Sequence, residues 1–269
     1  MRTRIFSFIA FAAALASAQN PSINQGGIVN AADLQAPLAP GSLFSIFGSR
    51  LSSQMASALS IPLSSQLGGV TVQFVNGPTT INAPMLYVQP DSSSSISQIN
   101  AQVPWDLVTP GTTATVNVIV SHDNVSSPPT PVTIGPFSPG IFASGTRAVA
   151  VNLDGTLVWP AGAIAGLTTH PAKPGDVIIV YATGLGAVDK PIANGAASLD
   201  ALRNTLTLPQ VLVGGLTAQV AFSGLSPQFV GVNQLNIVVP NAAPGDTVPI
   251  QIQVGGIVSP NTITIAVGN

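Results

Sequence analysis

Catalysis requires ionisable side chains that converge, and this sequence offers few of them. The chain has two histidines, His122 and His170, and nine acidic residues, every one an aspartate. His122 precedes Asp123 and Asn124 in a stretch typical of an exposed turn, and His170 lies far along the chain in another loop context. A serine hydrolase pairs a histidine with an acid and a serine on a shaped turn, and no Gly-x-Ser-x-Gly motif is present. A hydrolase is therefore only the third hypothesis for this chain.

The aspartates do not form pairs or clusters along the sequence. Most are next to glycine, asparagine or proline, where turn formation explains them. Glycoside hydrolysis needs two carboxyl groups facing one cleft, and calcium loops need acids at alternate positions. The nearest match to a calcium loop is Asn152-Leu153-Asp154-Gly155, which a hairpin turn explains better. We therefore expect no catalytic, cofactor-binding or metal-binding residues, and no cofactor.

The paired glycines of the chain do not predict a phosphate site. Gly68-Gly69 and Gly214-Gly215 have no helical pattern after them, and a phosphate site of this kind needs the N-terminus of a helix. Both pairs are predicted to be turns or bulges at the start of a strand.

Two tryptophans remain as candidates for a binding site. Trp105 follows Pro104 and Trp159 precedes Pro160, each near a predicted strand end. An aromatic ring in such a place can form a stacking platform for a sugar, or it can cap a hydrophobic core. We favour core capping for both, and the alternative is a carbohydrate-binding module that uses one exposed tryptophan. The sequence does not decide whether Trp105 or Trp159 is exposed.

These residues are positioned by a strand pattern that occurs twice. Residues 98–104 (QINAQVP) match residues 234–240 (QLNIVVP), and each copy is followed by a Pro-Gly turn and a second strand. Apolar side chains alternate with others in both copies, which is typical of a half-buried strand. The residues predicted to face the two cores are Ile99, Ala101 and Val103 in the first copy and Leu235, Ile237 and Val239 in the second.

The opposite face of the repeated strand carries amides. Gln98 and Asn100 lie there in the first copy, and Gln234 and Asn236 in the second. Each pair precedes a proline, which cannot donate to a strand ladder, and lies near connections whose backbone groups need partners. We predict that Asn100 and Asn236 form hydrogen bonds with neighbouring loop backbone and contact no ligand.

Further segments match at nearly the same offset. Residues 42–47 match residues 176–181, and Pro40 precedes Pro174 by 134 residues, whereas Gly68 precedes Gly214 by 146. The difference predicts a loop insertion within residues 189–210. Five or six short strands per copy, separated by turns, predict a small β-sandwich.

The sequence thus predicts an all-β protein of two tandem immunoglobulin-like β-sandwich units. The first unit comprises residues 19–136 and the second residues 137–269. Residues 148–158 alternate around Asp154-Gly155, a strong signal for a type I′ turn, and predict a β-hairpin at the junction.

Composition and charge restrict the class of protein. Only 6% of residues are charged, and Gly and Pro number 26 and 24, which favours strands and turns over helices. Residues 1–18 predict a secretory signal peptide, with Arg2 and Arg4, an apolar stretch and the cleavage site Ala16-Ser17-Ala18. Its removal leaves five basic residues against nine acidic ones, a net charge of −4, which disfavours nucleic-acid binding. The chain has no cysteine, and after the signal no apolar run is long enough to span a membrane.

Residues 174–186 (PGDVIIVYATGLG), 226–240 (SPQFVGVNQLNIVVP) and 254–267 carry a family resemblance. They resemble the Solibacter-type uncharacterised C-terminal domain, a family of secreted β-rich proteins of soil Acidobacteria. The resemblance covers nearly all of the chain after the signal and implies an immunoglobulin-like, IPT/TIG-like β-sandwich in an exported protein. It implies no activity, because the family has none assigned.

We therefore expect an exported, non-catalytic protein that serves as a cell-surface or extracellular interaction or structural module. Its partner is expected to be a protein or a glycan at the cell exterior. An enzyme, a nucleic-acid partner and a membrane span in the mature chain are not expected.

Overall fold

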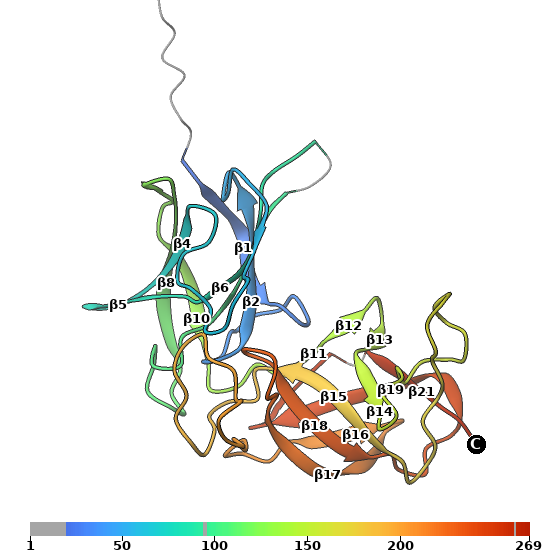
Figure 1. Ribbon diagram of the computed structural model, residues 1–269. Coiled ribbons are helices and arrows are strands. Elements are labelled where there is room, and N and C mark those ends of the chain that lie inside the picture. The colour runs from blue at the N-terminus through green and yellow to red at the C-terminus, as the bar shows by residue number, and fades with distance from the viewer. Residues whose placement is uncertain (1–19, 94–95, 261) are drawn as a thin grey trace, which may run out of the picture.

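The computed structural model describes residues 20–93, 96–260 and 262–269 (Figure 1). Every regular element within these ranges is a β-strand, as the composition predicts. None of the described residues forms a helix that is long and apolar enough to cross a membrane. The predicted signal peptide and the predicted mature N-terminus at Gln19 lie outside the described residues.

The first unit consists of two five-stranded antiparallel sheets, one in the order β1-β2-β7-β6-β3 and the other with the order β10-β8-β4-β5 and β9 paired to β8. Their facing side chains form one core, in which the rings of Phe44 and Phe74 meet edge to face at 5.4 Å between centroids. Two such sheets with a shared core make an immunoglobulin-like sandwich. The strands are β1 (Ser22–Asn30), β2 (Leu43–Ser49), β3 (Ala56–Ser57), β4 (Val70–Asn76), β5 (Thr79–Asn82), β6 (Met85–Gln89), β7 (Ser97–Gln102), β8 (Ala114–His122), β9 (Val125–Ser126) and β10 (Thr130–Ile134).

The strands of the second unit form one continuous network around a second core. The longest path is β11-β15-β18-β17-β16-β19-β21-β13-β12, with β14 paired to β15 and β20 to β19. Strand β17 pairs with β16 up to Ala218 and with β18 from Gln219 onward, with a bulge between Val220 and Phe222, so it passes from one layer to the other. The strands are β11 (Gly140–Ile141), β12 (Ala143–Ser144), β13 (Arg147–Ala148), β14 (Ala150–Asn152), β15 (Val177–Thr183), β16 (Gln210–Val213), β17 (Leu216–Leu225), β18 (Asn233–Val238), β19 (Gly245–Val254), β20 (Ile257–Val258) and β21 (Thr264–Val267).

The repeated strand is β7 in the first unit and β18 in the second. Each is central in its sheet, with β2 and β6 beside β7 and with β15 and β17 beside β18. The prediction of their core faces is confirmed, because all six side chains are fully buried or nearly so. The six residues are Ile99, Ala101, Val103, Leu235, Ile237 and Val239.

The hairpin predicted around Asp154-Gly155 is present, but its turn is not of type I′, because Gly155 has a positive φ and Asp154 does not. The Asn152 N–H donates to the Thr156 carbonyl at 2.8 Å, and Gly155 has φ +86°, which glycine adopts readily. The first arm of the hairpin is β14, which pairs with β15, and Leu157 on the second arm bridges to Val151 and to Thr169. The hairpin follows the passage between the units in the sequence and is built into the sheet of the second unit.

Candidate functional site

The two histidines lie on different units and do not share a site. His122 ends β8, and its Nε2 lies 3.1 Å from Oδ2 of the adjacent Asp123. The two atoms are close enough for an ion pair when the ring is protonated, but their contact does not have the geometry of a hydrogen bond. The buried Nε2 has no hydrogen-bond partner among the described residues.

His170 belongs to the Asp154 hairpin of the second unit. Its Nε2 lies 2.9 Å from Asp154 Oδ2, and its Nδ1 lies 2.9 Å from the Pro171 carbonyl oxygen. Because both ring nitrogens face acceptors, the protonated imidazolium is favoured and the pKa of His170 is raised. The hydrogen bond to Asp154 contributes most, and the bond to the Pro171 carbonyl comes next. The His170 and Thr156 donors hold the pKa of Asp154 well below its usual range. Neither ring nitrogen is therefore free to take a proton from a nucleophile. The His170–Asp154 pair instead stabilises the hairpin turn.

Trp159 caps the core of the second unit, as predicted. The side chain is 8% exposed, and its Nε1–H donates to the Ala148 carbonyl at 2.8 Å. A ring buried in this way offers no face to a sugar.

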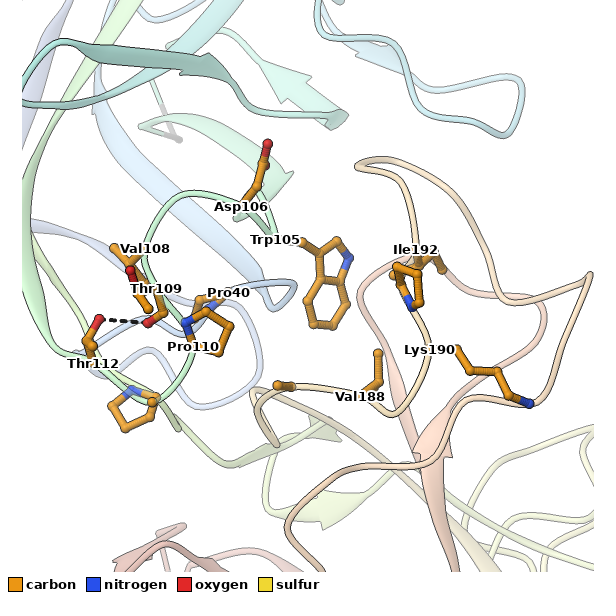
Figure 2. A pocket seen from close by; sticks show the side chains of 14 residues that line it. Pro40, Trp105, Asp106, Val108, Thr109, Pro110, Thr112, Val188, Lys190 and Ile192 are labelled. Atoms are coloured by element: carbon orange, nitrogen blue, oxygen red, sulfur yellow. Dashed lines mark hydrogen bonds between the residues drawn. The ribbon is translucent and has the colours of Figure 1, made fainter.

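Trp105 does not cap a core, and the prediction of core capping is wrong for this residue. It is half-buried at the junction of the two units, where it lines a cavity of about 570 Å³. Figure 2 shows the indole between Pro110 on one side and Val188 and Ile192 on the other. We call this cavity the junction groove, and its lining residues are Pro40, Trp105, Asp106, Val108, Thr109, Pro110, Gly111, Thr112, Pro136, Ala187, Val188, Lys190, Pro191 and Ile192.

The predicted insertion builds one wall of this groove. The segment between β15 and β16 lies against the lower end of the first unit in Figure 1. Asn194 of the insertion accepts the backbone N–H of Trp105 at 2.7 Å and donates to Asp106 at 2.8 Å. The next residue, Gly195, accepts the N–H of Leu63 at 2.8 Å. The offset in the repeat located this insertion, but its contacts with the first unit have no signal in the sequence.

The polar side chains around the groove are largely engaged within the protein. Asp106 Oδ1 accepts from Asn194, Lys190 Nζ donates to the Leu202 carbonyl at 3.0 Å, and Thr112 Oγ1 donates to the Thr109 carbonyl at 2.7 Å, drawn dashed in Figure 2. The accessible wall is therefore mainly proline rings, aliphatic side chains and the indole.

Gly41 lies close against the indole ring of Trp105. Gly41 has φ +77°, and a Cβ atom built there would lie 2.2 Å from the Trp105 ring. The Trp105 Nε1–H is buried and has no partner among the described residues. Figure 2 shows this nitrogen on the side of the ring that faces Ile192. A buried donor without an acceptor costs about 1–3 kcal/mol, so the groove holds an unsatisfied group.

The amides of the repeated strand do not bond loop backbone, and that prediction is wrong. Asn100 Oδ1 accepts from Gln98 Nε2 at 2.8 Å, and Asn236 Oδ1 accepts from Gln234 Nε2 at 2.9 Å. The side chain that bonds loop backbone is Gln102, at the end of β7, which the sequence did not single out. Among the described residues, no three His or Asp side chains gather in a way that could hold a metal ion.

Comparison with known proteins finds similarity only among solved structures. No family model matches the chain, and no curated protein matches it. The Bacteroides ovatus mixed-linkage glucan utilization locus SGBP-B, in complex with a mixed-linkage heptasaccharide, is 11% identical with a TM-score of 0.34, over 94% of this chain and 47% of that chain. Domains 5–6 of the S-layer protein SbsC are 10% identical with a TM-score of 0.29, over 92% and 98%. The C-terminal domain of Streptococcus agalactiae BspA is 10% identical with a TM-score of 0.20, over 93% and 100%.

The chain thus spans about half the length of the first of these structures. Identities near 10% and TM-scores below 0.5 transfer no ligand and no activity to this chain.

Proposed function

We propose that this protein is an exported, non-catalytic interaction module of the cell exterior, and that it belongs to the Solibacter-type family that it resembles. The observation that carries the proposal is the junction groove. An insertion of the second unit is bonded to the first unit and forms a concave site that needs both units. Concave sites at the interface of two domains are common places for ligands.

The character of the groove favours an uncharged, extended peptide segment. Asp106 and Lys190 carry opposite charges and hydrogen-bond to neutral groups of the protein, so together they favour neither an anionic nor a cationic ligand. Aromatic-lined grooves recognise proline-rich segments, which are already extended in solution and lose little entropy on binding. We propose that a partner protein places such a segment against Trp105.

A sugar fits this groove less well. A saccharide is recognised through its hydroxyl groups as well as its C–H face, and the lining of this groove consists mainly of proline rings and aliphatic side chains. A carbohydrate-binding module that uses a tryptophan as its platform is therefore not favoured, because Trp159 is buried and Trp105 lies among mainly apolar side chains.

Calorimetric titration with defined peptides tests the proposal. The probes are decaproline and a ten-residue peptide of alternating proline and leucine, with a Gly/Ser peptide of equal length as the comparison. We expect saturable binding of at least one proline peptide and none of the Gly/Ser peptide. Trp105→Ala should abolish the binding, because it removes the floor of the groove.

Phe229→Ala is the matched control, because Phe229 is an aromatic residue, 51% exposed, that does not line the groove. It should bind like the unaltered protein. Failure of both proline peptides to bind, or equal binding by the Trp105→Ala variant, would overturn the assignment of the groove.

A further inference from the structure

A polar and aromatic cluster occurs on the outer sheet face of both units. In the first unit, a register shift between Met85 and Tyr87 places Tyr87 directly opposite Asn100. In the second unit, the bulge of β17 places Phe222 directly opposite Asn236. Each asparagine accepts from the glutamine two residues before it. Both units therefore place an aromatic residue opposite the asparagine of a paired Gln and Asn.

The first copy has two further hydrogen bonds with neighbouring side chains. Ser45, opposite Asn100 on β2, donates its Oγ to Asn100 Oδ1 at 3.0 Å. Gln89, opposite Gln98 on β6, accepts from Tyr87 Oη at 2.7 Å. Asn100 Nδ2 and Gln98 Oε1 themselves have no hydrogen-bond partner among the described residues, so the two copies share these free amide atoms and differ in the neighbours around them.

The second copy lacks both of these neighbours. Ile179 is opposite Asn236 in place of the serine, and Gly224 is opposite Gln234 in place of the second glutamine. Within the part of the chain that the structure describes, Asn236 Nδ2 and Gln234 Oε1 have no hydrogen-bond partner. One donor and one acceptor thus remain on the outer face of the same strand.

The insertion turns this open face into a cavity of about 540 Å³, which we call the amide cavity. Leu199 and Leu202 line it from the insertion, with 71% and 61% of their surface exposed. Asp200 also lines it, and its two carboxylate oxygens accept from Arg203 at 2.7 and 3.0 Å. Because this carboxylate is already paired, the cavity offers little attraction to a charged ligand.

The Phe222 ring lies along the floor of the amide cavity. A Cβ atom built on Gly224 would lie 2.6 Å from Phe222 Cζ, so the ring reaches over this glycine. Gly224 is opposite Gln234, so the ring covers the residue that pairs with this glutamine. The half-buried ring therefore offers an apolar surface next to hydrogen-bonding groups.

We infer that the amide cavity binds a neutral pyranose saccharide. A pyranose presents a face of C–H bonds, which packs on an aromatic ring, and hydroxyl groups that donate and accept at its edge. Phe222 provides the first contact, and Gln234 Oε1 and Asn236 Nδ2 accept from and donate to the hydroxyls. This site is separate from the junction groove and does not depend on the peptide assignment.

Titration with defined oligosaccharides tests this inference. The probes are the neutral hexasaccharides of cellulose, xylan, mannan and laminarin, and a hexagalacturonate is the charged comparison. Binding is detected by the amide NMR shifts of the full mature chain. We expect saturable shifts around β17 and β18 with at least one neutral probe and none with the charged one. Asn236→Ala and Phe222→Leu should each weaken the affinity at least about tenfold, since each removes about 1.4 kcal/mol or more of contact.

Phe222→Leu keeps an apolar side chain at this place, so loss of binding in that variant is not explained by unfolding. Asn100→Ala is the matched control, because it removes the equivalent amide in the first unit, which does not line the amide cavity. Trp105→Ala separates this site from the junction groove. Both should bind like the unaltered protein. The inference is overturned if no neutral probe binds, if the Phe222 and Asn236 variants bind normally, or if Asn100→Ala is equally impaired.

Discussion

The side-chain oxygen of Gln102 accepts the backbone N–H of Gly195 at 2.8 Å, across the junction of the two units. The Nε2 of the same side chain donates to the Gly41 carbonyl at 3.2 Å within the first unit. Gln102 is 1% exposed, so water does not replace either partner readily. One buried amide therefore joins the repeated strand of the first unit, the loop beneath Trp105 and the insertion of the second unit.

Gln102→Leu should destabilise the fold by about 1–3 kcal/mol. The substitution leaves a buried N–H at Gly195 and a buried carbonyl at Gly41 without their present partner. Urea unfolding measures the loss. Gln98→Leu, on the same strand but half-exposed, is the control and should cost clearly less. Equal losses would show that Gln102 does not join the units.

The equivalence of the two cores gives a second prediction. Ile99 and Leu235 are both fully buried at matching places of the repeat. Replacing either by Ala should cost about 2–5 kcal/mol through lost burial and the cavity left behind. Thr71→Ala, on the outer face of β4 and half-buried, should cost less than about 1 kcal/mol. Similar losses at all three sites in urea unfolding would contradict the assignment of faces.

The His170–Asp154 pair gives a prediction for pH. The pKa of His170 is raised, so its contribution to stability is complete below the unfolded value of about 6.5 and is lost as pH rises through the folded pKa. The pKa of Asp154 is lowered, so its contribution is present above about 3.9 and is lost as pH falls through the folded pKa. The pair therefore stabilises the turn most between about pH 4 and 6.5. Because both side chains are 43–56% exposed, solvent screening keeps the effect on stability small.

NMR titration of the His170 ring checks this directly. The folded protein should show a pKa for His170 above the ordinary value, and Asp154→Asn should lower it toward that value. A His170 titration that Asp154→Asn leaves in place would show that the hydrogen bond is not the cause.

The strands could be predicted because their signals are local. Alternating apolar residues in β7 and β18, and the proline that follows each strand, determine which side chains are buried. The amide prediction failed because the partners of Asn100 and Asn236 depend on register. Bulges in β6 and β17 decide that Tyr87 and Phe222 stand opposite the asparagines, and a sequence pattern with period two does not show where a bulge occurs.

The binding sites could not be predicted for a related reason. Both cavities form where the insertion contacts other elements, and these contacts are distant in sequence. Trp105 and Asn194 are 89 residues apart, and they meet only because the insertion reaches the first unit. The sequence located the inserted residues, but the surface that they cover follows from tertiary packing.

Gly41→Ala should open the junction groove. A methyl group at this position would lie 2.2 Å from the Trp105 ring, and the glycine has φ +77°, which costs an alanine about 1–2 kcal/mol by itself. The indole must therefore move away from the loop, where it will be more exposed to water. We expect a loss of stability in urea and a red shift of tryptophan emission, while the buried Trp159 is unaffected.

Gly111→Ala separates the backbone strain of the Gly41→Ala substitution from its collision with the Trp105 ring. Gly111 also lines the groove and has φ +80°, but an added Cβ meets no atom within 4 Å. This variant carries the backbone strain without the collision, so it should lose about 1–2 kcal/mol and keep the emission spectrum of the unaltered protein. Gly41→Ala should lose more, and adding Trp105→Val should recover part of the difference because it removes the ring. If both alanine variants lost the same stability and neither shifted the emission, Gly41 would not be what holds Trp105 in place.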